Sequence, residues 1–196
     1  MCPFLRFALA IAVAAPAFGA TIDVRVQTPR GGAVRDAVVY AVPEGRTVPL
    51  ANKAAVMDQK NRMFIPHVLP VQTGTSVRFP NSDDIRHHVY SFSPAKKFQL
   101  PLYKGTPANP VVFDVAGVVT LGCNIHDQMT AFIVIVDTPY FEKTPANGRV
   151  ALRDLAPGRY TLRVWYPDMR DEPQPQSITA TGSERLTATF VANARP

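Results

Sequence analysis

Three side chains that can bind a metal lie close together near the middle of the chain. Cys123, His126 and Met129 follow one another at a spacing of three residues and offer a thiol, an imidazole and a thioether. Two more imidazoles, those of His87 and His88, lie upstream in a segment with the composition of a β-strand. One thiolate, two imidazoles and a weak thioether are the ligand set of mononuclear blue-copper sites, which exchange single electrons. The residues therefore predict a site of this kind.

Only one of the two adjacent histidines is expected to reach the metal. Neighbouring side chains of a strand point to opposite faces, so His87 and His88 cannot both face one ion without distortion. The sequence by itself leaves the choice between them open.

The cysteine content agrees with a metal-binding role for Cys123. The chain has two cysteines, and Cys2 lies in an N-terminal segment that we expect to be removed. Thiols of exported proteins usually pair in disulfides, and a single remaining cysteine has no partner within the chain. Metal coordination explains the lone cysteine, and an inert buried thiol is the alternative.

Residues 1–20 have the features of an export signal. Arg6 supplies positive charge, residues 7–17 form an apolar run that is short for a membrane span, and small residues follow it. We therefore expect a periplasmic protein that is not held in the membrane once the signal is cleaved between residues 17 and 20. An uncleaved membrane anchor is the alternative.

The segments around the candidate ligands alternate between apolar and polar residues, as half-buried strands do. The chain has 19 prolines, and many β-branched residues lie between them, which favours short strands and turns. We predict strands over residues 21–27, 37–42, 63–71, 75–79, 87–92, 111–123 (two strands), 130–137, 148–155, 159–166, 177–181 and 186–191. Residues 93–110 are expected to form a long loop. Strands of this length and spacing indicate an all-β sandwich.

We expect the candidate metal site to lie in a domain of its own, over residues 55–137. Residues 21–54 and 138–196 flank it in the sequence. Their strands are predicted to belong together as a second small sandwich, so that the metal domain is an insertion between its halves. The alternative is that the flanking strands extend the first sandwich.

The charge is positive but scattered. The formal net charge is +6, and no basic run with interleaved aromatic residues occurs, so nucleic-acid binding is not implied. A diffuse positive surface can steer the encounter with an acidic redox partner. Solubility alone is an equally good explanation of this charge.

The region of the candidate site resembles the cupredoxins of the plastocyanin and amicyanin group. The resemblance depends on the segment Phe79-Pro80-Asn81, on six residues from Asn81 to His87, and on a Cys-x2-His-x2-Met loop of amicyanin length. It implies a Greek-key β-sandwich that holds one type 1 copper ion. The implied ligands are His87, Cys123, His126 and Met129.

The same resemblance assigns roles to neighbouring residues. His88 takes the place of an asparagine that supports the cysteine side of the site in the family, and it stays an alternative ligand. The broader arrangement is similar to exported cupredoxin-like proteins connected with methylamine utilization. Residues 148–166 resemble the transthyretin-like sandwich of carboxypeptidase regulatory domains.

These observations predict a periplasmic electron carrier that is not an enzyme. A c-type cytochrome or a periplasmic dehydrogenase is the kind of redox partner that this function implies. A protein for copper storage, delivery or tolerance is the alternative, and a structural or glycan-binding module is a third. The adjacent carboxylates Asp83 and Asp84 are interpreted as solvated or turn-forming groups, not as an acid/base pair.

Overall fold

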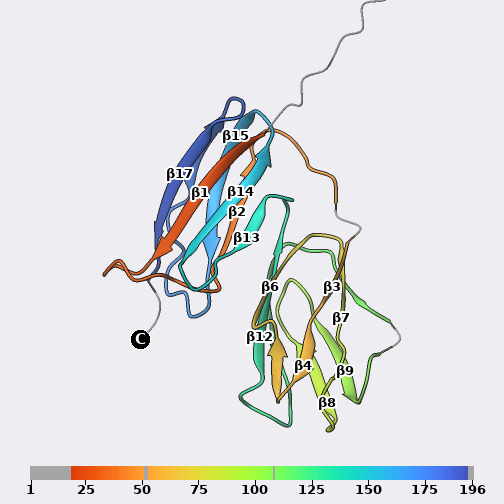
Figure 1. The fold of residues 1–196 in the computed structure, drawn as a ribbon. Helices are drawn as coiled ribbons and strands as arrows, with labels where there is room; N and C mark the ends of the chain where they lie inside the picture. Colours follow the sequence, from red (N-terminus) through yellow and green to blue (C-terminus); the bar gives the residue numbers. More distant parts are fainter. Residues whose placement is uncertain (1–18, 51–52, 108, 194–196) are drawn as a thin grey trace, which may run out of the picture.

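The computed structural model describes residues 19–50, 53–107 and 109–193, and the regular elements of these residues are all β-strands (Figure 1). The predicted all-β fold is thereby confirmed. Residues 1–18, which make up most of the predicted export signal, lie outside the described residues. Within the described ranges, no helix has the length and apolar character that a membrane crossing requires.

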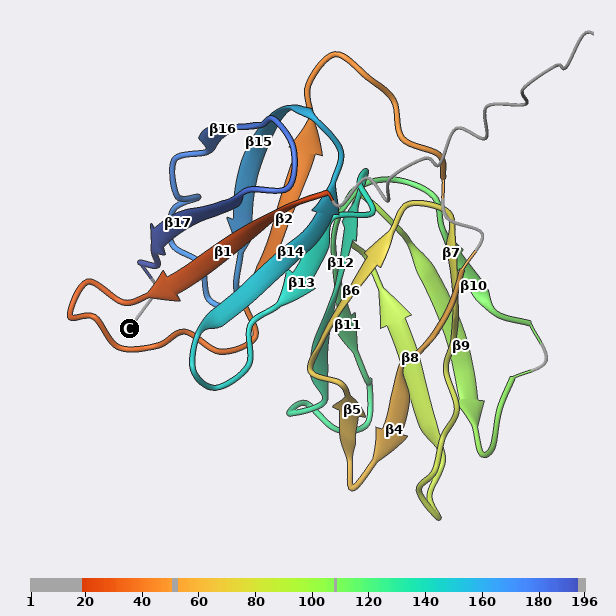
Figure 2. The same cartoon turned by 45° about the horizontal axis from the view of Figure 1, so that its top comes forward.

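Strands from the two ends of the chain form two facing sheets, on the left of Figure 2. The first sheet has the order β14 (Arg149–Leu155), β1 (Ala20–Gln27), β17 (Arg185–Val191). The second has the order β13 (Phe141–Lys143), β2 (Val38–Pro43), β15 (Gly158–Trp165), β16 (Gln176–Ala180). Their inner faces share one core, in which Ile22, Leu152 and Leu162 are fully or almost fully buried. Burial alternates along β1 and β15, as the predicted pattern requires.

The middle of the chain forms a second pair of facing sheets. One sheet has the order β6 (Val68–Gln72), β12 (Thr130–Val136), β11 (Gly117–Gly122), β8 (His87–Ser91), β9 (Phe98–Tyr103). The opposite sheet has the order β10 (Val111–Phe113), β7 (Thr75–Arg78), β3 (Ala54–Val56). A hairpin of β4 (Asp58–Lys60) and β5 (Met63–Ile65) closes one end. Val77, Phe113 and Ile133 lie in the shared core.

The residue types of two strands in this second sandwich agree with the sheet order. The apolar strand β12 lies between β11 and β6, so it is central in its part of the sheet. Strand β6, which contains Pro70, is at the edge, where a residue without an N–H group leaves no hydrogen bond unmade.

The prediction of a long loop over residues 93–110 was wrong. This segment contains β9, which pairs with β8 at the other edge of the sheet. Phe98 and Leu100 pack against the core, and the edge position tolerates Pro101. The prolines of this segment concealed the short alternation of partly buried and exposed residues along β9.

The β4–β5 hairpin was also not predicted as such. Its turn residues Asn61 and Arg62 have φ angles of 55° and 57°, the conformation of a two-residue hairpin turn. Arginine is not a residue that signals such a turn in a sequence.

The two pairs of sheets contact each other through a small apolar cluster. Val38, Val68 and Val134 are buried there, and the rings of Phe132 and Trp165 lie 5.1 Å apart. The Lys143 ammonium donates a hydrogen bond of 2.8 Å to the carbonyl of Val68. The domain boundaries 21–54, 55–137 and 138–196 remain our proposal for the organisation of the chain.

Candidate metal centre

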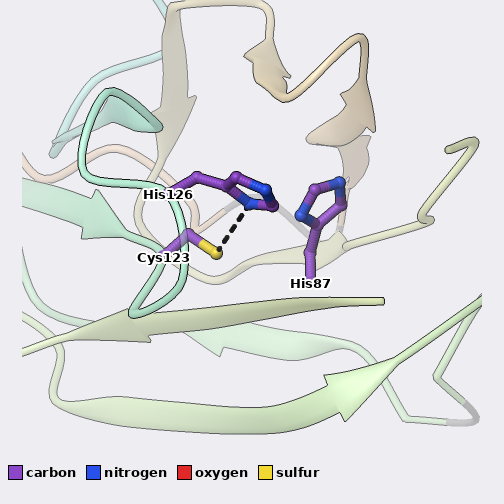
Figure 3. Close-up of side chains that lie close together, drawn as sticks. All are labelled: His87, Cys123 and His126. Atoms are coloured by element: carbon purple, nitrogen blue, oxygen red, sulfur yellow. Dashed lines mark hydrogen bonds between the residues drawn. The ribbon is translucent and has the colours of Figure 1, made fainter. Parts of the chain in front are cut away.

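Three of the four predicted ligands converge where β8 begins and β11 ends. His87 is the first residue of β8, Cys123 follows β11, and His126 lies in the loop that leads to β12. Strands β8 and β11 are antiparallel neighbours, with Gly122 paired to Tyr90, so the start of one lies beside the end of the other. One ligand atom from each of the three residues lies within 4.8 Å of the others, and Figure 3 shows the side chains facing one another.

The loop after β11 holds Cys123 and His126 in a fixed relation. The Sγ atom of Cys123 lies 4.0 Å from Nδ1 of His126. Within the loop, the N–H of Met129 donates to the carbonyl of His126 at 2.9 Å. Cys123 is buried, whereas His126 is partly exposed. The site therefore has an interior side and a side that faces solvent.

Met129 lies in the interior of the protein. It is 1% exposed and belongs to the same hydrophobic core as Cys123. A thioether in such surroundings suits a weak, long metal bond. Its role as the axial ligand stays a prediction.

The His87 ring is oriented by a carboxylate. Its Nε2 atom lies 2.7 Å from Oδ2 of Asp83, and its side chain is fully buried. Its Nδ1 atom is buried and has no hydrogen-bond partner among the described residues. The ring centroid lies 5.0 Å from that of His126. Because an unpaired buried nitrogen is costly, this free Nδ1 fits a donor to a metal ion.

His88 faces away from this cluster. Its ring packs against Tyr90 at 5.4 Å, and both its ring nitrogens are buried without a partner in the described part of the chain. Burial lowers the pKa of His88, which favours its neutral form. Of the two adjacent histidines, His87 is the one whose ring atom lies near Cys123 and His126.

Asp83 contacts His87, and the sequence did not reveal this contact. The sequence was interpreted as giving a solvated or turn-forming carboxylate here, and the first alternative is wrong for Asp83, because its side chain is only 13% exposed. It accepts hydrogen bonds from the N–H groups of Asn61 at 2.6 Å and Arg62 at 2.9 Å. Asp84, in contrast, is exposed. The only sequence signal was the spacing of four residues between Asp83 and His87.

Asp83 stays ionised in this setting. Burial alone would raise the pKa of Asp83, but the hydrogen bonds from Arg62, His87 and Asn61 bring it below its ordinary value. An ionised carboxylate only accepts hydrogen bonds, so the hydrogen between the two side chains belongs to Nε2 of His87.

The donor set fits one transition-metal ion. Bonds of about 2.3 Å to sulfur and about 2.0 Å to nitrogen place two ligand atoms up to about 4.3 Å apart. The observed separation of 4.0 Å between Cys123 and His126 lies within that limit. The three ligand atoms as a group lie within 4.8 Å of one another, so they have to move closer together to share one ion.

Comparisons with known proteins give no match to a family model and none to a curated protein. Among solved structures, a purple cupredoxin from Nitrosopumilus maritimus matches with 20% identity and a TM-score of 0.37, over 42% of this chain and 99% of that one. A reduced amicyanin variant matches with 22% identity and a TM-score of 0.39, over 50% of this chain and 98% of that one. A copper-containing nitrite reductase from Thermus scotoductus matches with 22% identity and a TM-score of 0.41, over 50% of this chain and 25% of that one. The similarity to proteins of methylamine utilization stays a prediction.

Proposed function

We propose that this protein holds one type 1 copper ion and carries single electrons between redox partners in the periplasm. The observation that supports the proposal is the convergence of ligand atoms from His87, Cys123 and His126 within 4.8 Å. Met129, buried in the same hydrophobic core as Cys123, would complete the ligand set expected of a blue-copper site. When bound, copper supplies the electron by alternating between its two oxidation states.

The donor types favour copper over zinc. A thioether is a poor ligand for zinc, whose protein sites use thiolate, imidazole and carboxylate groups. Copper(II) also lies above zinc in the general order of affinities for nitrogen and sulfur ligands. The free Nδ1 of His87 and the buried sulfur of Cys123 are soft or borderline donors that suit both oxidation states of copper.

The surroundings of the ligands suit electron transfer. Two rigid strands and a loop with its own backbone hydrogen bonds hold the side chains, so the ligands need to move little when the charge of the metal changes. His126 is partly exposed, and we assign it as the point at which the electron enters and leaves. No substrate bond is made or broken in this function.

The partner is proposed to be a redox protein, such as a c-type cytochrome or a periplasmic dehydrogenase. The net positive charge of the chain, which remains after loss of the N-terminal segment with Arg6, favours a partner with an acidic surface. Beside His126 the exposed loop residues Asp127 and Gln128 are polar, while Ile125 is 47% exposed and apolar. This mixed surface suits a brief encounter and not a permanent complex.

The visible and EPR spectra of the protein loaded with one equivalent of Cu(II) test this function. We expect an intense thiolate-to-copper absorption with a small copper hyperfine splitting. Cys123→Ser is expected to abolish both. His67→Asn, which changes an exposed histidine outside the cluster, serves as the matched control and is expected to keep them.

Two other results would contradict the proposal. A pale Cu(II) complex would show that Cys123 does not bind the ion. Immediate bleaching with Cu(I) retained would point instead to copper storage or delivery.

A further inference from the structure

We propose that Asp83 is a positioning residue of the metal site, whose carboxylate fixes His87 as an Nδ1 ligand and favours the oxidised metal. The observation is the contact of 2.7 Å between Asp83 Oδ2 and His87 Nε2, on the side of the ring away from the free Nδ1. The redox part of this proposal rests on the proposed function. The positioning part concerns the protein chain alone.

The contact decides which ring nitrogen can bind a metal. A neutral imidazole carries one hydrogen, on either nitrogen, and the other nitrogen then has a free electron pair. The carboxylate holds the hydrogen on Nε2, so the free pair is on Nδ1. Nδ1 is the atom that needs a partner, and it belongs to the ring that lies beside His126.

The carboxylate is itself held in place from several sides. The tip of the β4–β5 hairpin gives it two backbone N–H groups, from Asn61 and Arg62. Both turn residues have positive φ angles, so the hairpin turn directs these groups toward Asp83. Because three donors fix the two oxygens, the position of the carboxylate does not depend on the metal.

The loop that carries Asp83 is fixed by Asn81. The N–H of Asp83 donates to Oδ1 of Asn81 at 3.0 Å. The Nδ2 group of Asn81 donates to the carbonyls of Ile85 at 2.9 Å and Tyr103 at 2.8 Å. These hydrogen bonds hold the loop between β7 and β8 in the conformation in which Asp83 faces His87.

A carboxylate in this position changes the ligand strength of the imidazole. An acceptor on the remote N–H group raises the basicity of the coordinating nitrogen, and such partners typically change metal affinity by about 10- to 100-fold. The effect is larger for Cu(II) than for Cu(I), because the more highly charged ion gains more from a stronger donor and a nearby negative charge. Asp83 thus lowers the reduction potential of the site.

Asp83→Asn removes the charge and replaces one acceptor oxygen with an amide group. We expect the ratio of Cu(II) to Cu(I) affinity to fall about tenfold, at the lower end of the range for such partners. For a one-electron couple this raises the reduction potential by about 59 mV. Asp84→Asn makes the same charge change at the adjacent, exposed residue, where water and salt screen it, and its shift is expected to be much smaller.

NMR of the histidine ring nitrogens in the metal-free protein tests the positioning part without copper. The unaltered chain is expected to show His87 with its hydrogen on Nε2, in slow exchange with water. Asp83→Asn is expected to weaken this preference and speed the exchange, and Asp84→Asn to leave both unchanged. A spectrum of the unaltered chain with the hydrogen on Nδ1, or with no preference, would overturn the positioning role even if the variants failed to fold.

The two proposals fail in different ways. A colourless copper complex overturns the proposed function and with it the redox part, while the NMR result still decides the positioning part. A blue complex whose potential shifts equally in Asp83→Asn and Asp84→Asn overturns the redox role of Asp83 and leaves the electron-carrier function intact.

Discussion

The ring of Tyr90 lies directly against the backbone of Gly122, so that a Cβ atom at Gly122 would come within 2.8 Å of the Cζ atom of Tyr90. The two residues are paired across β11 and β8. Gly122 immediately precedes Cys123, and Tyr90 lies three residues after His87. This contact therefore fixes the approach of the two strands that deliver the cysteine and the upstream histidine.

Gly122→Ala is expected to destabilise the protein by about 1–3 kcal/mol, because the added methyl group overpacks the contact with Tyr90. The same change should shift the thiolate-to-copper absorption, since Cys123 is the next residue. Denaturant unfolding and the visible spectrum measure the two effects. In a Tyr90→Ala background, Gly122→Ala should destabilise the protein much less. An equal cost in both backgrounds would show that the Tyr90 contact is not its cause.

The two adjacent histidines are expected to respond oppositely to replacement. His87→Asn should abolish the blue absorption, because it removes the imidazole, one nitrogen of which lies within 4.8 Å of the ligand atoms of Cys123 and His126. His88→Phe should keep the absorption and raise the free energy of unfolding by about 1 kcal/mol, since it removes two buried nitrogens that lack partners in the described chain. Copper titration followed by absorbance tests the effect of each variant on the metal site, and thermal unfolding tests the effect of His88→Phe on stability. Loss of colour in His88→Phe alone would assign the ligand to His88.

Tyr103 is expected to ionise only in strong alkali. Burial raises its pKa from 10.0 to about 12, and its hydroxyl donates a hydrogen bond of 2.7 Å to the carbonyl of Phe79. Since the pKa of Tyr103 is raised in the folded state, its contribution to stability is complete below pH 10 and is lost as the pH rises through 12. The measurement is the ultraviolet titration of tyrosinate in the folded protein, compared with Tyr103→Phe.

Tyr103→Phe also tests the hydrogen bond. The free energy of unfolding of the variant should be lower by about 1–2 kcal/mol at neutral pH, because the carbonyl of Phe79 and the side chain of Gln59 each lose a hydrogen-bond partner. The difference in free energy of unfolding between the variant and the unaltered chain should become smaller as the pH approaches 12. A difference that grows with pH would mean that Tyr103 is not buried as a neutral phenol.

The contact between the two pairs of sheets can be followed through the single tryptophan of the chain. Phe132→Ala should shift the emission of Trp165 to longer wavelength, because the rings are 5.1 Å apart and the deletion admits water. The copper absorption should stay unchanged, since Phe132 lies outside the core that contains Cys123. Phe92→Ala, at a residue that is 76% exposed, is the control. Equal emission in both variants would contradict the contact.

The sequence predicted those features that depend on near neighbours along the chain. The spacing of Cys123, His126 and Met129 places all three in one loop, and apolar alternation marks most strands, because a strand buries every second side chain. The all-β fold followed from the same local pattern. Strand β9 and the β4–β5 hairpin were missed, because prolines and an arginine in the turn masked their local signals.

Only the tertiary structure decided how distant residues meet at the site. The pairing of β8 with β11 brings His87 to Cys123, and the pleat turns His88 to the opposite face; the sequence does not specify that register. Asp83 gained its role because a hairpin turn some twenty residues earlier directs two N–H groups at its carboxylate. Such contacts depend on the relative positions of separate strands, and the types and spacing of residues do not determine these positions.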